Sequence, residues 1–287
     1  VELLRTPWTC FDAANYGTLM VLDPEEAFSN AEMEKLEADV RSQQLSVLMI
    51  GDWHDAQQLM NIRFQDDNTR SQWYPIVGGS NIPSMNNFLN RFGMSFGLRA
   101  FEGSFPLDSR SVKLMSGNTI AQWPKSKENL KSMIIRAPSG DVYPSVKTNL
   151  RQSTSLSQVL VGGATISRAE KGVKKVGDGT AYNGRIVVYG DSYCFDTQTP
   201  GFGNITTPAY LSCVELYGQF FRFITQGSFS IYEDHKLPAH MEVLHSDFVD
   251  GRLLMPNVNL PKDLQEQLVE DEELRKSDFQ RYSYSII

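Results

Sequence analysis

Two stretches of the sequence share one form, a short apolar run that ends in Gly-Asp, and this form limits the folds open to the chain. The first run, Leu45–Ile50, leads into Gly51-Asp52, and the second, Ile186–Tyr189, leads into Gly190-Asp191-Ser192. Short β-branched runs bounded by turn residues are typical of strands buried on both faces. Such strands belong to parallel sheets that helices cover. We therefore predict an α/β layer with both Gly-Asp corners at the sheet edge where α/β proteins usually place their sites.

Helical patterns between and around these runs predict an open, mainly parallel sheet flanked by helices. A strand is predicted at residues 18–22, and a helix follows it to about Arg41. We place the start of this helix at Asp23, with Pro24 in its first turn and Glu26 completing a capping box. The expected starts of the later helices are marked by a cap or an early proline, at Asp55, Pro83 and Thr207-Pro208. On the last of these helices we place seven residues toward the core, namely Tyr210, Cys213, Val214, Tyr217, Phe220, Phe221 and Ile224.

The helical periodicity stops in the middle of the chain and again near its end. We predict one α/β domain over residues 1–227 that carries a β-rich insertion at about 106–184, where short apolar pieces lie between Gly, Ser and Pro. Residues 228–287 are predicted to form a partly helical tail of unknown role. Its only clear element begins near Pro261, where leucines recur at four-residue steps.

Composition narrows the class of protein. The 287 residues are 41% hydrophobic, which is enough for a core and argues against global disorder. The formal net charge of -7 argues against a nucleic-acid partner, because phosphate binding requires a basic surface. No apolar run approaches the roughly 18–20 residues of a membrane helix. The three cysteines, Cys10, Cys194 and Cys213, permit one disulfide or three free thiols, and composition alone slightly favours free thiols.

One interpretation of the second corner is catalytic. Gly190-Asp191-Ser192 after a strand resembles the nucleophile block of SGNH-type esterases, in which a histidine activates the serine. That histidine follows an aspartate by three residues in those enzymes, and none of the four histidines here does so. The block also comes late in this chain. We therefore expect a turn stabilised by Asp191, and keep a small-molecule hydrolase using Ser192 as the alternative.

Other polar clusters have simple structural explanations. The histidines at five-residue steps, His235, His240 and His245, do not fall on one face of a helix or a strand, so we expect no metal there. Gly78-Gly79-Ser80 precedes a helix and could hold an anion, but a tight backbone turn explains it better. The acids that a cation could use, Asp52, Asp55, Asp66 and Asp67, are explained equally well as caps and loop residues.

Four ordered blocks carry a family resemblance. They are Pro7–Leu19, Asp52-Trp53, Asp67–Pro75 with Gly78–Pro83, and Ile186–Cys194. In order and spacing they are similar to the region after the protease domain in the site-1 protease family of subtilisin/kexin-like enzymes. The resemblance covers about residues 1–227 and is weakest between 106 and 184. It implies a glutamine-amidotransferase-like α/β fold without that family's catalytic cysteine.

The resemblance also implies a function and a compartment. The parent would be a single-pass type I membrane protein of the secretory pathway, in the lumen of the endoplasmic reticulum or Golgi. Its protease domain would cut membrane-tethered precursor proteins. This segment would support the folding, stability or regulation of its own upstream subtilisin domain, with room for a regulatory protein as a further partner. The third hypothesis, after the hydrolase, is a stand-alone binding module.

No catalytic residue of a subtilisin can be assigned, because the chain contains none of the three triad motifs of these enzymes. We therefore expect a segment that is inactive alone and has no cofactor of its own; any calcium site would lie in the protease domain. The membrane helix and basic cytosolic tail that the resemblance implies are missing from this sequence, so we expect either a fragment or a divergent end of such a protein.

A secretory location changes the expectation for two sites. Asn204-Ile205-Thr206 is an N-glycosylation acceptor sequence that becomes meaningful in a lumenal protein. An oxidising lumen also permits a disulfide between Cys194 and Cys213, since 18 residues (213 − 194 − 1) separate them. The helix that carries Cys213 must fold back toward the strand end at Cys194. Cys10 would then be the unpaired cysteine.

Overall fold

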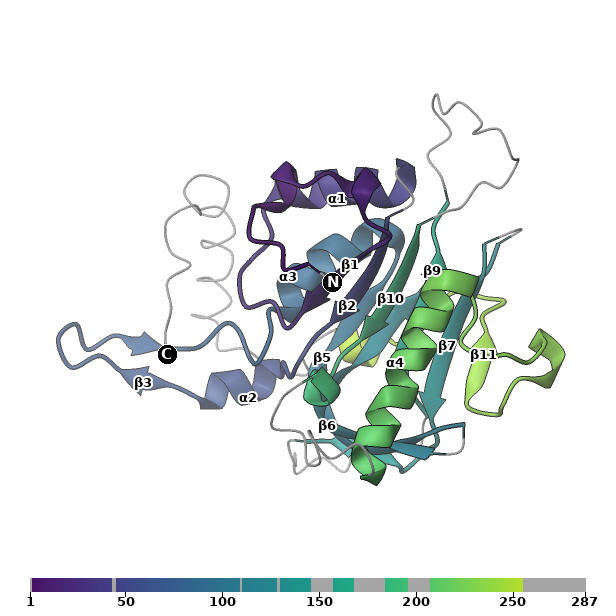
Figure 1. Ribbon diagram of the computed structural model, residues 1–287. Coiled ribbons are helices and arrows are strands. Elements are labelled where there is room, and N and C mark those ends of the chain that lie inside the picture. Colours follow the sequence, from purple (N-terminus) through teal and green to yellow (C-terminus); the bar gives the residue numbers. More distant parts are fainter. Residues whose placement is uncertain are drawn as a thin grey trace.

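A computed structural model describes residues 2–42, 45–108, 110–127, 130–145, 157–167, 184–195 and 207–254. Its centre is a six-stranded sheet in the order β1-β2-β10-β9-β7-β11 (Figure 1). The strands β1 (Thr18–Leu22), β2 (Ser46–Ile50) and β10 (Arg185–Tyr189) are parallel neighbours. The register places Val47 opposite both Leu19 and Ile186. The predicted α/β class and the three parallel strands are confirmed.

The second half of this sheet is antiparallel, so the prediction of a mainly parallel sheet holds only for the first half. Strands β9 (Gln158–Thr165), β7 (Ser132–Ala137) and β11 (Met241–Val243) each pair antiparallel with their neighbour. Antiparallel pairing needs no crossover helix between the paired strands. The absence of helical periodicity in this part of the sequence is the sign of that arrangement.

A long hairpin forms most of a second, four-stranded sheet in the order β12-β6-β5-β8. Its main strands are β5 (Ser95–Leu107) and β6 (Arg110–Trp123), which pair antiparallel with several register shifts. The short strands β8 (Val142–Pro144) and β12 (Phe248–Val249) flank them. A separate small hairpin, β3 (Phe64–Gln65) with β4 (Gln72–Trp73), extends away from the body in Figure 1. The segment predicted as β-rich is thus built into the fold, while the predicted domain limits stay a prediction.

Helices cover the two faces of the six-stranded sheet differently. On one face α1 (Asn30–Ser42) and α3 (Ile82–Leu89) pack through Leu36, Val40 and Phe88 against Val47 and Ile186. On the other face α4 (Pro208–Gln226) packs against alternate residues of the same strands (Figure 1). Side chains alternate between the faces of a strand, so β2 and β10 supply both cores. Five consecutive residues of β2 are accordingly buried.

The first helix begins later than predicted. It starts at Asn30, and the capping box is formed by Ser29 and Glu32, whose carboxylate accepts the Ser29 N–H at 2.9 Å. The Glu32 N–H donates to Ser29 Oγ at 3.3 Å. Asp23 instead has a left-handed backbone, with φ of 47°, and closes the end of β1. The predicted helix start at Asp23 was therefore wrong. A capping residue followed three residues later by Glu occurs at both Asp23 and Ser29, and the second of these caps the helix.

The caps of the other helices are as predicted. Asp55 accepts N–H groups from Gln57 and Gln58 at 3.0 Å and so begins α2 (Ala56–Asn61). Pro83 lies in the first turn of α3, behind the cap Asn81. Thr207 caps α4, which ends at Gly227 with φ of 75°. A short last helix, α5 (Gly251–Leu254), ends the described part of the chain.

The buried face of α4 is rotated relative to the predicted one. Phe220, Cys213 and Ile224 are buried as predicted. Val214 and Phe221, which we placed toward the core, are 44% and 45% exposed. Their places are taken by Leu216 and Phe223, among the buried residues of the helix. An aromatic-rich helix offers apolar side chains around much of its circumference, so its periodicity does not choose one face.

The chain beyond residue 227 contributes to both sheets through β11 and β12, and Phe229 is fully buried against Phe223. The sequence shows no clear element here, because strands of two or three residues carry little periodicity. The helix predicted near Pro261 lies outside the described residues.

Removing a buried aromatic ring should lower the stability of this core far more than removing an exposed one. Phe88→Ala and Phe220→Ala should each lower the free energy of unfolding by about 3–5 kcal/mol, because both rings are fully buried. Phe221→Ala, next to Phe220 on the exposed side of α4, is the matched control and should cost less than about 1 kcal/mol. Chemical denaturation measures all three. Equal losses for Phe220→Ala and Phe221→Ala would contradict this orientation of α4.

Candidate functional site at the carboxyl edge of the sheet

The three parallel strands end at one edge of the sheet, and an aspartate follows each of them. Asp23 follows β1, Asp52 follows β2 after one glycine, and Asp191 follows β10 after one glycine. This is the edge at which open α/β sheets bind ligands. A ligand site at this edge requires polar groups that the protein does not already use for its own backbone.

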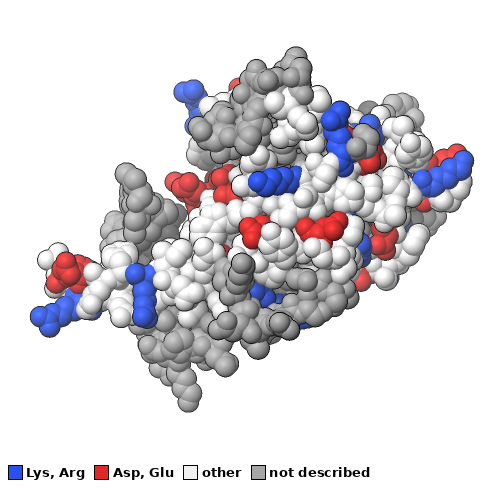
Figure 2. All heavy atoms as spheres, turned by 90° about the horizontal axis from the view of Figure 1, so that it is seen from below, with Lys and Arg blue, Asp and Glu red and all other residues white. Residues whose placement is uncertain are grey.

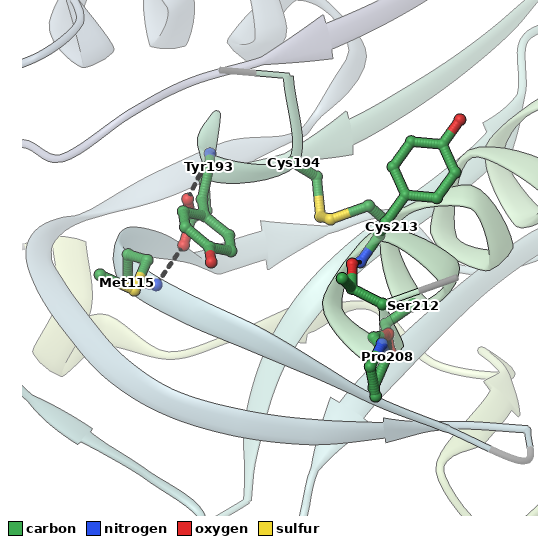
Figure 3. The surroundings of a disulfide bond; sticks show 9 residues. Met115, Tyr193, Cys194, Pro208, Ser212 and Cys213 are labelled. Atoms are coloured by element: carbon green, nitrogen blue, oxygen red, sulfur yellow. Dashed lines mark hydrogen bonds between the residues drawn. A yellow bond between two sulfur atoms is a disulfide. The ribbon is translucent and has the colours of Figure 1, made fainter. Parts of the chain in front are cut away.

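Asp191 is used by the protein. Its side chain is buried and accepts hydrogen bonds from the Tyr193 N–H at 2.8 Å and the Met115 N–H at 2.5 Å (Figure 3). These bonds connect the turn after β10 to strand β6. Burial raises the pKa of Asp191 to about 6, and the negative charge of Asp52 adds to this rise, while the backbone N–H groups oppose it. The carboxylate therefore stabilises the turn, as the sequence predicted for it.

Asn118, on β6, connects the two Gly-Asp corners. Its side-chain carbonyl accepts the His54 N–H at 2.8 Å, and its amide donates to the carbonyls of His54 at 2.7 Å, Gly97 at 2.8 Å and Arg99 at 3.1 Å. Its backbone N–H donates to the Gly190 carbonyl at 2.8 Å. The side chain is fully buried. Sequence analysis missed this residue, whose only signal is an uncharged polar side chain just before an apolar strand segment.

Three glycines of the predicted turns permit these close contacts. A Cβ on Gly190 would lie 2.0 Å from the Asn118 carbonyl oxygen. A Cβ on Gly78 would lie 2.3 Å from the Trp53 carbonyl oxygen, and one on Gly79 would lie 2.0 Å from an Asp52 carboxylate oxygen. A larger residue at Gly190 or Gly78 would displace corner backbone, and one at Gly79 would displace the Asp52 and Trp53 side chains. The glycines at both corners therefore serve backbone packing.

The loop Gly78-Gly79-Ser80, which could have held an anion, is hydrogen-bonded to the protein's own backbone instead. The Gly79 N–H donates to the Trp53 carbonyl at 2.7 Å, and the Ser80 hydroxyl accepts the Asp52 N–H at 2.8 Å. Ser80 is fully buried. Since these groups already have partners, the tight-turn interpretation of Gly78-Gly79-Ser80 fits the geometry better than an anion site.

Ser192 lacks the partner that catalysis requires. Its carbonyl accepts the Phe195 N–H at 2.6 Å and closes the turn. Among the described residues, which include all four histidines, no hydrogen bond joins the Ser192 hydroxyl to an imidazole. The nearest histidine in the corner sequences, His54, is buried, and burial lowers its pKa to about 4. A nucleophilic serine needs a base within hydrogen-bond reach.

The candidate metal ligands are dispersed. Within the described ranges, no group of three or more His, Cys, Asp or Glu side chains could hold a metal ion. Asp55 caps α2, and Asp66 accepts the Thr69 hydroxyl at 2.7 Å in the loop between β3 and β4. His235 is exposed and lies 3.2 Å from Glu233. The expectation that this segment needs no cofactor stays a prediction.

The structure brings Cys194 and Cys213 together. They form a disulfide with a Cα–Cα distance of 5.3 Å, which joins the turn after β10 to the second turn of α4 (Figure 3). Both residues are buried, whereas Cys10 is a free, exposed thiol. The predicted glycosylation site Asn204 lies outside the described residues.

Asp23, the acid that follows β1, is only partly compensated by the protein. One oxygen of its carboxylate is buried without a hydrogen-bond partner among the described residues. Burial raises the pKa of Asp23 to about 7, and the negative charges of Asp52 and Glu25 add to the rise. Folding therefore favours the protonated form of Asp23 near neutral pH.

Mild acidification should stabilise the fold for this reason. A carboxyl whose pKa is higher in the folded than in the unfolded state contributes stability that is lost as the pH rises through the folded value. Asp23 should therefore raise the free energy of unfolding as the pH falls from 8 to 6.5. The buried His54 opposes part of this rise, because its pKa is lowered to about 4 in the folded protein and the unfolded chain binds that proton more readily. Asp23→Asn should flatten this dependence, and Asp67→Asn in the exposed hairpin should not. Denaturation series at these pH values test it; a steeper slope in Asp23→Asn would contradict it.

The comparisons with known proteins agree with this fold. The protein family described as MBTPS1, fourth GATase-like domain, matches residues 1–210. The subtilisin-like protease SBT6.1 of Arabidopsis thaliana is 34% identical over 201 residues, which are 69% of this chain and 17% of that protein. The human membrane-bound transcription factor site-1 protease is 36% identical over 197 residues, or 68% of this chain and 17% of that protein.

The chain spans about a sixth of the length of these relatives, as the 17% coverage states. Within the part that the structure describes, no helix has the length and apolar character to cross a membrane. The match over residues 1–210 nevertheless exceeds half of the chain. The chain therefore belongs to the family of the fourth, GATase-like domain of site-1 protease.

Proposed function

We propose that the chain is a non-catalytic companion domain of a subtilisin-like serine endopeptidase and lies after the catalytic domain. The observation that carries this proposal is the carboxyl edge of the sheet, where Asp191, Asn118 and Ser80 hold the protein's own backbone groups. A ligand-binding edge would leave such groups available. The named relatives are proteases, and the triad motifs of subtilisins are absent from this sequence.

The domain would support the folding, stability or regulation of the protease domain on the same polypeptide. The substrates of the parent would be membrane-tethered precursor proteins of the secretory pathway, and a regulatory protein could act through this domain. We place the parent in the lumen of the endoplasmic reticulum or Golgi as a type I membrane protein, with any calcium bound by its protease domain. Figure 2, which views the molecule from below in Figure 1, supports a protein partner over nucleic acid, since its visible acids and bases form separate small groups.

Expression of the chain through a mammalian secretory pathway tests this proposal. A fluorophosphonate probe should not label the secreted protein, because none of the four histidines, which all lie in the described ranges, is hydrogen-bonded to the Ser192 hydroxyl. Peptide mapping without reduction should recover Cys194 and Cys213 in one linked peptide pair. Glycosidase treatment should shift the mobility of the protein, and Asn204→Gln should abolish the shift.

Each of these three measurements tests a different part of the proposal. Labelling that disappears in Ser192→Ala would replace the companion domain with the small-molecule hydrolase. Free Cys194 and Cys213 thiols, or an unmodified Asn204, would contradict the lumenal location and leave the non-catalytic role standing. A parent transcript without a subtilisin triad upstream would favour a stand-alone binding module.

A further inference from the structure

A large apolar groove lies beside β1, at the edge of the six-stranded sheet. It has a volume of about 730 Å³, and apolar side chains from three parts of the chain line most of it. The amino-terminal segment contributes Leu4 and Phe11, β1 contributes Met20, and α4 contributes Phe221. Phe221 is 45% exposed, whereas the adjacent Phe220 is fully buried. Among the helices that the structure describes, α4 is the one that packs on this sheet face, and none of them lies over its part beside β1 (Figure 1).

The backbone of β1 is open on the same side. β1 is the end strand of the sheet and pairs only with β2. The Gly17 carbonyl accepts the Ser46 N–H at 3.0 Å, and the Asp23 N–H donates to the Ile50 carbonyl at 2.9 Å, so odd-numbered residues of β1 face β2. In a parallel pair each residue that faces the neighbour uses both of its backbone groups there. The N–H and C=O groups of Thr18, Met20 and Leu22 therefore point outward.

No backbone partner occupies this edge among the described residues, because the backbone hydrogen bonds of the amino-terminal segment stay within that segment. An uncovered strand edge is a template for pairing with another extended chain. An apolar groove beside such an edge supplies pockets for the alternate side chains of the added strand.

An acidic cavity continues the groove at the carboxyl end of β1. It has a volume of about 420 Å³, and Trp8 lines both cavities. Four acids line it, and its lining contains no Lys or Arg; the acids are Asp23, Glu25, Glu26 and Glu32. The charges of Asp52 and Glu25 already raise the pKa of Asp23, and one buried oxygen of Asp23 has no partner among the described residues. A positive charge placed here would relieve the mutual repulsion of these carboxylates.

We propose that this edge binds an extended peptide segment of another protein or domain, which adds a strand to β1. Its apolar side chains would occupy the groove beside Met20 and Phe221, and one or two basic side chains would lie in the acidic cavity. Both features together select the occupant. An apolar strand without basic residues would leave the acids unpaired, and a basic segment without apolar residues would leave the groove empty.

Labelled peptides of alternating valine and threonine with two arginines at one end test the proposal on the full 287-residue chain. Two peptides, with the arginines first or last, cover the two strand directions. By fluorescence anisotropy we expect one of them to bind saturably, and at least ten-fold more tightly than its glutamine-for-arginine analogue. Met20→Pro should weaken this binding at least ten-fold, because it removes an outward N–H and leaves the pairing with β2 intact.

Matched variants separate the groove from general surface effects. Phe221→Glu should weaken binding at least ten-fold, and Val214→Glu, an equally exposed position of α4 that does not line the groove, should not. Glu26→Lys should weaken binding, and Asp67→Lys should not. Phe221→Glu keeps the test valid if Met20→Pro fails to fold, because Phe221 is already half exposed.

Three results would overturn the inference. Neither peptide binding above its glutamine analogue would exclude a strand with a basic end. Equal affinity of Phe221→Glu and Val214→Glu would place the peptide elsewhere. Concentration-dependent dimerisation of the chain that Phe221→Glu abolishes would assign the groove to a second copy of the chain instead.

Discussion

The fold depends on one buried amide, that of Asn118. Its side chain satisfies both the N–H and the C=O of His54, and its backbone N–H holds the carbonyl of Gly190. The two Gly-Asp corners, more than 130 residues apart in the sequence, are thereby fastened to the same strand. Buried backbone groups at strand ends need partners, and an irregular corner cannot supply them from a sheet ladder. The long β5–β6 hairpin supplies them here.

This arrangement explains why the edge that binds ligands in other α/β proteins is closed at the ends of β2 and β10 in this one. Asp191 and Asn118 both connect corner backbone to β6, and Gly78 and Gly79 bring a further loop against Asp52 and Trp53. The disulfide between Cys194 and Cys213 then fixes α4 to the same corner. Polar groups that could serve chemistry thus serve to position backbone. The open surface lies elsewhere, along the outer edge of β1.

Local patterns in the sequence are enough to predict the parallel half of the sheet. The apolar runs before Gly51 and Gly190, the cap at Asp55 and the Thr207-Pro208 start each depend on neighbouring residues, so a single sequence suffices for them. The side chain of Asn118 acts through partners 19 to 64 residues away, and no local pattern reports such contacts. The prediction of where α1 starts was wrong for a related reason. Asp23-Pro24 and Ser29 are both acceptable caps, and only the tertiary position of β1 selects between them. Phe220 and Phe221 are adjacent aromatic residues, and the packing of α4 alone decides which is buried.

The central claim is that hydrogen bonds at the carboxyl edge, above all those of Asn118, hold the two Gly-Asp corners in place. The free energy of unfolding of Asn118→Ala tests this claim most directly. Losing this amide leaves several buried backbone groups of the corners without partners, at about 1–3 kcal/mol each. We predict a loss of about 3 kcal/mol or more by chemical denaturation, against less than about 0.5 kcal/mol for Lys113→Ala, an exposed position of the same strand. A loss below about 1 kcal/mol for Asn118→Ala would show that the corners are stable without the Asn118 side chain.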